Sequence, residues 1–328
     1  MYGFLKLSSA GAKSALARCA TQWDRFFFAP ADPTPVGLVR FGVGCLLFWN
    51  LAVLGLDLPD YLGTDGWIAP EANRHYLAEH TPGSWSFWFS VPDGGLRVVW
   101  LACLVVTGSF ALGYRSRATA LLSWAIAVST VRRMPVALFG FDHIISTWMF
   151  YLAFSGASGQ ALSIDGFLSR RRQMRRISAL PVKAASNRID TLSEPPTPTI
   201  SANLCLRMIQ LHLALIYGCA GLSKLTSPEW RNGTAMMMLV LTPEFRRFDL
   251  SWTFAYPTLL HAATYSGLVF ELLYPVCVWL TKFRAALICA AALMHVGIDL
   301  ILGLTEFGLA MIVGNIAFIP GKPLLLIV

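Results

Sequence analysis

Long apolar runs recur along the whole chain and are separated by shorter polar or basic segments. A helix needs roughly 17–25 residues to cross a bilayer, and most of the runs approach this length. The eight runs cover about residues 35–56, 96–114, 118–131, 143–154, 204–225, 256–280, 285–304 and 307–319. This pattern predicts an all-α fold, a polytopic integral membrane bundle of about eight transmembrane helices.

Composition supports a membrane protein. Hydrophobic residues make up 55% of the chain and charged residues only 13%, whereas soluble proteins carry about 25% charged residues. Lipid must therefore cover much of the surface. Six of the seven cysteines lie in apolar stretches without ligand spacing, so we interpret them as small core residues and expect no metal site.

Basic residues mark the side of the membrane that each segment faces. Residues 1–34 mix four cations with Phe26, Phe27 and Phe28, which is typical of an amphipathic segment on the cytoplasmic surface rather than of a secretory signal. The remaining residues, 35–328, form one transmembrane domain. A basic, proline-rich segment at about 166–202 is predicted to be a mobile cytoplasmic loop. The positive-inside rule then places both termini in the cytoplasm and accounts for the net charge of +8 without nucleic acid.

The third run is interrupted early by two cations. Arg132 and Arg133 follow after about 14 residues, too few to cross a bilayer at 1.5 Å per residue. Either this helix is short or the arginines lie inside the protein at membrane depth. The predicted topology brings them to one level with Asp142, His143 and Lys224. We therefore expect a polar cavity that opens toward the non-cytoplasmic face.

Lys224 lies near the end of the fifth run. Pro228 should end that helix, and Trp230 should lie at the membrane surface. Lys224 is either an anchor that extends to the interface or a base held in a dry site. His143 is correspondingly either a group that donates a hydrogen bond or a proton to a reacting molecule, or a helix-start residue bonded to backbone or to Asp142.

Two later runs also carry ionisable groups. Glu271 lies in the middle of the sixth run, where an isolated charge is costly, so it is either paired or protonated. His295 and Asp299 are four residues apart and share one helix face. This spacing suits a histidine oriented by a carboxylate, and it equally suits a structural hydrogen bond.

Several short motifs together resemble one family. They are Leu38-Val-Arg-Phe-Gly42, Tyr61 with Asp65-Gly-Trp67, Leu112-Gly-Tyr-Arg-Ser-Arg117, Arg132-Arg-Met-Pro135, Asp142-His143, Ser163-Ile-Asp165, Ala220-Gly-Leu-Ser-Lys-Leu225 with Trp230-Arg-Asn-Gly233, Glu271-Leu-Leu-Tyr-Pro275 and His295. In this order the chain resembles the HTTM (horizontally transferred transmembrane) domain proteins and, through them, the membrane part of vitamin K-dependent gamma-carboxylase.

The resemblance implies a quinol-dependent membrane enzyme of carboxylase-like or oxygenase-like chemistry. Its cofactor would be a reduced quinone similar to vitamin K hydroquinone, with O2 and CO2 as co-reactants. Lys224 matches the lysine that activates the quinol and His143 matches a histidine near the reacting centre. The expected cofactor-binding residues are Arg132, Arg133, Asp142, Trp230, Glu271 and His295. The resemblance covers nearly the whole chain, in order. We expect no counterpart of the large lumenal portion with which the carboxylase binds protein substrates, so the resemblance does not imply carboxylation of a protein.

Two non-catalytic functions compete with this hypothesis. A transporter or lipid-handling protein would line a path with the same polar groups, and it would be expected to show inverted repeats and broken helices. No clear repeat is evident in the sequence. A structural membrane subunit would instead pair every charge in a closed interior.

Overall fold

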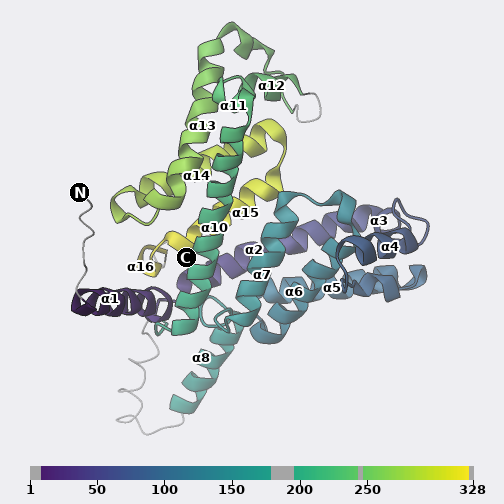
Figure 1. Ribbon diagram of the computed structural model, residues 1–328. Coiled ribbons are helices and arrows are strands. Elements are labelled where there is room, and N and C mark those ends of the chain that lie inside the picture. The colour runs from purple at the N-terminus through teal and green to yellow at the C-terminus, as the bar shows by residue number, and fades with distance from the viewer. Residues whose placement is uncertain (1–8, 179–195, 243–246, 325–328) are drawn as a thin grey trace.

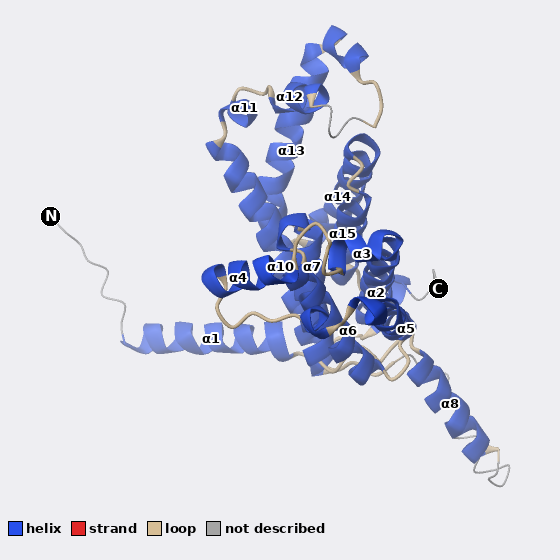
Figure 2. Cartoon of the chain, turned by 90° about the vertical axis from the view of Figure 1, so that its right-hand side faces the viewer, coloured by secondary structure: helices blue, strands red, loops and turns tan. Residues whose placement is uncertain are grey.

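The computed structural model describes residues 9–178, 196–242 and 247–324. Within these ranges the chain is helical and forms no strand, as predicted, and a single isolated bridge joins Ala31 to Thr199 (Figures 1 and 2).

The α-helices of the described residues are α1 (Ser9–Phe28), α2 (Thr34–Leu54), α3 (Leu58–Leu62), α4 (Pro70–His80), α5 (Leu96–Leu112), α6 (Ser116–Arg133), α7 (Gly140–Phe154), α8 (Ile164–Ile177), α10 (Ile200–Thr226), α11 (Pro228–Arg231), α12 (Ala235–Leu241), α13 (Pro257–Cys277), α14 (Thr281–Leu302), α15 (Thr305–Asn315) and α16 (Gly321–Leu324). Short 3-10 turns connect them at η1 (Gly55–Asp57), η2 (Phe87–Ser90), η3 (Asp93–Gly95), η4 (Pro135–Ala137), η6 (Ser251–Ala255) and η7 (Ile316–Phe318).

Four helical segments in the described residues are long and apolar enough to cross a membrane: Thr34–Leu62, Asp93–Leu112, Ile200–Thr226 and Thr281–Leu302. A shorter apolar segment covers Thr305–Phe318. These segments support a membrane protein, but they do not confirm the predicted count of about eight spans. Among the other predicted spans, α6 carries three arginines and α7 has only 15 residues.

A buried arginine ties the first span to the rest of the core. The core is built where α2 packs on α5, α6 on α7, and α15 on α2. Arg40 of α2 is 1% exposed. Its guanidinium donates to the carbonyls of Ser158 (2.8 Å), Ala161 (3.2 Å) and Leu162 (2.6 Å), which follow α7. Because buried cations need partners, these carbonyls hold the segment after α7 against α2.

The second packing unit is the pair α10 and α13. In Figure 1, α10 runs from the end of α1 to α11 and α12, which lie at its far end. Pro228 begins α11, so the predicted end of the fifth span is confirmed to within two residues. The neighbouring α14 is the least covered of the four apolar segments, because only Ala291 and His295 are buried among its 22 residues. Lipid is the natural cover for such a surface.

Two polar helices project from the body (Figure 2). The N-terminal segment is helical in α1, and only its last turn packs on α10 through Phe26, whereas residues 15–25 are exposed. The prediction of a loop at about 166–202 is wrong for both ends of that segment, because Ile164–Ile177 forms helix α8 and α10 begins at Ile200. Ser163 caps α8 by accepting from the amide of Gly166, and straight-chain arginines favour a helix. Residues 179–195 of that segment lie outside the described residues.

Candidate functional site

Lys224 is paired with a carboxylate from the neighbouring helix. Its Nζ lies 2.7 Å from Oε1 and 2.5 Å from Oε2 of Glu271. The side chains are 23% and 11% exposed. Of the two states expected for Glu271, the structure therefore shows the paired one. The amine thus contacts a carboxylate of the neighbouring helix, and part of the lysine side chain is still accessible.

Two glycines of α10 make this pair possible. A Cβ on Gly221 would lie 3.1 Å from the amide nitrogen of Leu272, and one on Gly218 would lie 3.3 Å from the ring of Pro275. The two helices therefore approach closely at these positions, as small residues allow in membrane proteins. Lys224 is three residues after Gly221 and lies on the same helix face. The Gly-x-x-Lys and Glu-x-x-x-Pro motifs thus form one contact surface.

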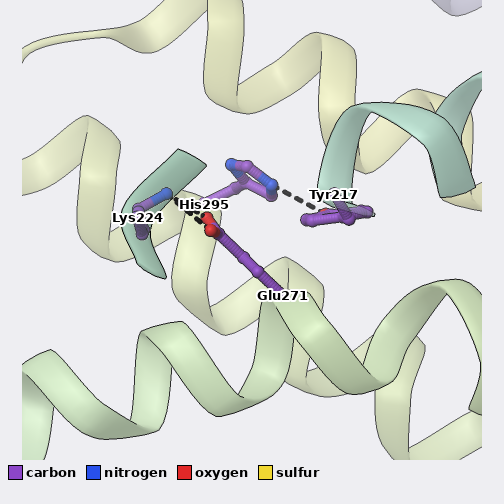
Figure 3. A network of polar contacts seen from close by, with 4 residues as sticks. All are labelled: Tyr217, Lys224, Glu271 and His295. Atoms are coloured by element: carbon purple, nitrogen blue, oxygen red, sulfur yellow. Dashed lines mark hydrogen bonds and ion pairs between the residues drawn. The ribbon is translucent and has the colours of Figure 1, made fainter. Parts of the chain in front are cut away.

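A second polar pair lies beside the first. The hydroxyl of Tyr217 is 2.8 Å from Nε2 of His295, and both side chains are 2% exposed (Figure 3). The charge of Lys224 acts on His295. Nδ1 of His295 is buried and has no hydrogen-bond partner among the described residues. Since buried polar atoms are nearly always paired, this nitrogen is available for a further partner.

Trp230 completes the site from the segment after α10. Its ring centroid lies 5.0 Å from Nζ of Lys224, within the range of a cation–π contact. The turn at Ser227 and the short helix α11 bring the indole back over the amine. The structure therefore brings together four of the predicted site residues: Lys224, Trp230, Glu271 and His295.

The predicted arginines lie in another part of the molecule. Arg133 is fully buried and donates to the carbonyls of Ile68 (3.0 Å), Leu62 (3.1 Å) and Gly63 (3.1 Å). It fastens the loop before α4 to the end of α6. Arg132 is half-buried, and its own carbonyl accepts from the amide of Asn73. Of the two alternatives for this pair, the structure shows α6 extending through both arginines, with Arg133 inside the protein.

Asp142 and His143 lie at the start of α7 and do not contact Lys224. The carboxylate of Asp142 accepts from the amide of Phe139 at 2.9 Å and caps the helix. The side chain of His143 is exposed and forms no hydrogen bond with any residue that the structure describes. Phe307 lies between the two regions, because its ring is 5.6 Å from that of His295 and also borders Gly140. Lys224 and His143, which were expected to lie at one level and line one polar cavity, are therefore not in contact.

Asp299 does not orient His295, although the two share a helix. Its carboxylate accepts from the hydroxyl of Thr305 at 2.5 Å and lies 3.4 Å from Nη1 of Arg247. Tyr217 takes that position instead. Sequence reasoning gave Tyr217 no role, although it lies seven residues before Lys224, a spacing that returns to the same face of α10.

The site can exchange protons but offers few metal ligands. A lysine and a carboxyl in direct contact can share one proton between two positions. Tyr217 and His295 add a hydroxyl and an imidazole within the same helices. Within the described ranges, no group of three or more histidine, cysteine or acidic residues is arranged to hold a metal ion.

The family comparison covers this site. Residues 184–322 match the family model of the HTTM domain. The match includes Tyr217, Lys224, Trp230, Glu271 and His295, whereas Arg132, Arg133, Asp142 and His143 lie before it. No curated protein and no solved structure matched the chain. The resemblance inferred from the motifs is confirmed for this region, which matches the HTTM domain, and the apolar helices support a membrane protein.

Proposed function

We propose that the chain is a membrane enzyme that removes a proton from the hydroxyl of a lipid-like substrate, with Lys224 as the base. The supporting observation is the direct contact of Lys224 with both oxygens of Glu271 in a site that lies entirely within the family match. Convergent ionisable groups among apolar helices are typical of functional sites in membrane proteins.

The pair can supply a neutral amine. When the shared proton lies on Glu271, the amine of Lys224 is uncharged and can accept a proton from a substrate hydroxyl. The substrate then becomes an anion and Lys224 an ammonium, so charge is conserved. The ring of Trp230 and the carboxyl oxygens of Glu271 stabilise that ammonium from two sides. Neither Arg132 nor Arg133 is needed for this step.

A reduced quinone, similar to vitamin K hydroquinone, fits these residues as the hydroxyl donor. The side chain of Lys224 is 23% exposed, which leaves it accessible to a ligand, and the unpartnered Nδ1 of His295 is a further group able to bind a second hydroxyl. When bound, the quinol would supply the chemistry with O2 and CO2 that the resemblance implies. The residues of this chain would hold the ring, accept the proton and stabilise the resulting charge.

The substitution Lys224→Arg tests this function. Arginine keeps the positive charge and the pairing with Glu271, but it does not release its proton in proteins. We expect oxygen uptake by the purified protein with a reduced naphthoquinone to fall by about a hundredfold or more, as for loss of a general base. The melting temperature should change little.

Two measurements separate this function from its rivals. Organic extraction of the purified wild-type protein should recover a bound quinone. A transporter or lipid-handling protein would bind the quinone but would not depend on proton release at position 224. Unchanged oxygen uptake in Lys224→Arg, with intact folding, would refute the assignment of Lys224 as base.

A further inference from the structure

A cavity of about 290 Å³ lies at the opposite end of α10 from Lys224. It forms where the segment after α1, the start of α10, the start of α14 and the segment after η7 meet. Arg207 of α10 and Arg284 of α14 both line it, together with the amides of Asn203 and Gln210. Arg207 and Lys224 are about 25 Å apart along the helix at 1.5 Å per residue, so this cavity is separate from the proposed catalytic site.

The guanidinium of Arg207 is held in place by hydrogen bonds and by ring contacts. Its Nε donates to the carbonyl of Phe26 at 3.0 Å, and its Nη1 donates to Oε1 of Gln210 at 2.9 Å. The group also lies 4.3 Å from the ring centroid of Phe26. Gln210 is fixed in turn, because its amide donates to the carbonyl of Ala317. Nη2 of Arg207 makes no hydrogen bond within the described ranges.

Arg284 is held in a similar way by the turn before α14. Its Nε donates to the carbonyl of Val278 and its Nη2 to that of Trp279, both at 3.2 Å. Nη1 makes no hydrogen bond to a described residue. Each arginine is therefore fixed by carbonyl or amide oxygens and still has donors for a ligand. This arrangement is preorganised, since little further side-chain freedom would be lost on binding.

The two cations lack an acidic partner. The charge of Arg284 acts on Arg207, and neither arginine has a carboxylate within 4.0 Å among the residues that the structure describes. Asp32 also lines the cavity, but its Oδ1 accepts from the amide of Thr34 at 2.8 Å. Two guanidinium groups at one cavity repel each other unless an anion lies between them. A phosphate group suits this position, because its several oxygens can accept from both arginines.

We propose that this cavity binds the phosphate group of an anionic lipid. The adjoining surface favours a lipid over a soluble phosphate compound, because Leu280 and Phe283 beside Arg284 are 50% and 47% exposed. These apolar side chains could contact acyl chains while the arginines hold the headgroup. Basic pockets between membrane helices commonly bind lipid headgroups in this way.

The test titrates the full-length protein in non-ionic detergent with three probes. Dihexanoyl phosphatidic acid carries the phosphate on a lipid, dihexanoylglycerol lacks it, and inorganic phosphate lacks the lipid. Isothermal titration calorimetry should show saturable binding of phosphatidic acid and none of dihexanoylglycerol. Arg284→Gln should weaken binding by about tenfold or more, the loss expected for a charge-assisted hydrogen bond.

Matched variants control for general charge and for folding. Lys282→Gln removes the same charge from an exposed residue beside the cavity and should leave binding unchanged. Arg207→Lys is used instead of Arg207→Gln because it retains the charge and so protects folding. It should weaken binding because an ammonium lacks the planar array of guanidinium donors. Inorganic phosphate binding as tightly as phosphatidic acid would support the phosphate site and assign a soluble ligand. Equal binding of dihexanoylglycerol and phosphatidic acid, or full binding in a folded Arg284→Gln protein, would overturn the proposal.

Discussion

Gly221 of α10 and Leu272 of α13 lie in backbone contact, with only 3.1 Å between the position of a glycine Cβ and the leucine amide nitrogen. This contact determines how closely the two helices approach, and it allows the amine of Lys224 to reach Glu271. The Gly-x-x-Lys motif of α10 therefore serves helix packing and the polar pair together.

Substitution of Gly221 should separate the helices. Because the nearest atoms include backbone atoms of Glu271 and Leu272 in α13, Gly221→Val should destabilise the protein by about 1–3 kcal/mol through overpacking. Gly297→Ala of α14 is the control, because a Cβ there meets no atom within 4 Å. Thermal unfolding in detergent should show a lower melting temperature for the first variant and an equal or higher one for the second. Equal melting of Gly221→Val and wild type would contradict the close contact.

The Lys224–Glu271 pair should show strong coupling in a double-mutant cycle. Lys224→Ala leaves a carboxylate that is 11% exposed without its partner, and loss of one partner of a buried pair costs up to about 3–5 kcal/mol. Lys224→Ala combined with Glu271→Ala should recover much of this loss. Denaturation of the four proteins measures the coupling. Additive effects of the two substitutions would show that the pair does not stabilise the fold.

Arg133 and Arg132 provide a pair of neighbours with opposite expectations. Arg133→Lys cannot satisfy the three carbonyls of Leu62, Gly63 and Ile68. The donors of an ammonium all lie on one nitrogen, whereas those of a guanidinium are spread over a planar group. The substitution should destabilise the protein by about 2 kcal/mol and increase protease cleavage in the loop before α4. Arg132→Lys removes no hydrogen bond that the structure shows and should behave as wild type. Equal cleavage of both variants would contradict the role of Arg133.

Asp165 should make stability depend on acidic pH. Partial burial raises the pKa of the Asp165 carboxyl. Hydrogen bonds to the carboxylate lower it by more, so the pKa lies below its ordinary value. The donors are the amide and hydroxyl of Ser116 and the amide of Arg115. A depressed folded-state pKa stabilises the protein above the unfolded pKa of about 3.9, and this stability is lost as pH falls through the folded value.

The matching experiment compares Asp165→Asn with wild type between pH 7 and pH 3. The asparagine variant should be less stable by about 1 kcal/mol at pH 7, and the difference should shrink below about pH 4. Asp24→Asn in the exposed part of α1 is the control and should leave the pH profile unchanged. If the difference in stability between Asp165→Asn and wild type did not change with pH, the charge of the Asp165 carboxylate would not contribute to stability.

Sequence patterns predicted the helices better than their mutual contacts. The span that ends at Thr226 was predicted from the apolar run, the lysine and Pro228, because these features are local. Partners across helices were harder to predict. Topology gives the level of a residue in the membrane but not the direction in which its side chain points. For this reason Lys224 and His143 were expected to line one cavity, whereas the structure places Lys224 against Glu271. The direction could have been inferred from Gly218 and Gly221, which mark the face of α10 that approaches another helix.

The basic segments show a second limit of sequence reasoning. Arginine density and nearby prolines suggested an irregular loop, yet a serine cap and helix-favouring arginines produce α8. Conversely, the sequence pattern assigned no role to Arg207, because a single cation near the start of a span is common. Its importance depends on Arg284, which is 77 positions later in the chain, and only the fold brings the two to one cavity.

The sparse packing of α14 has a consequence for how the environment affects the site. Only 11% of the most apolar stretch of α14 is buried inside the protein. The same helix nevertheless carries His295, the partner of Tyr217. Helices adapt to a mismatch with bilayer thickness by tilting, and a helix with so few protein neighbours meets little resistance to that adjustment. Acyl-chain length should therefore tune the distance between the imidazole and the phenol, so that the surrounding bilayer becomes a determinant of the proposed proton transfer.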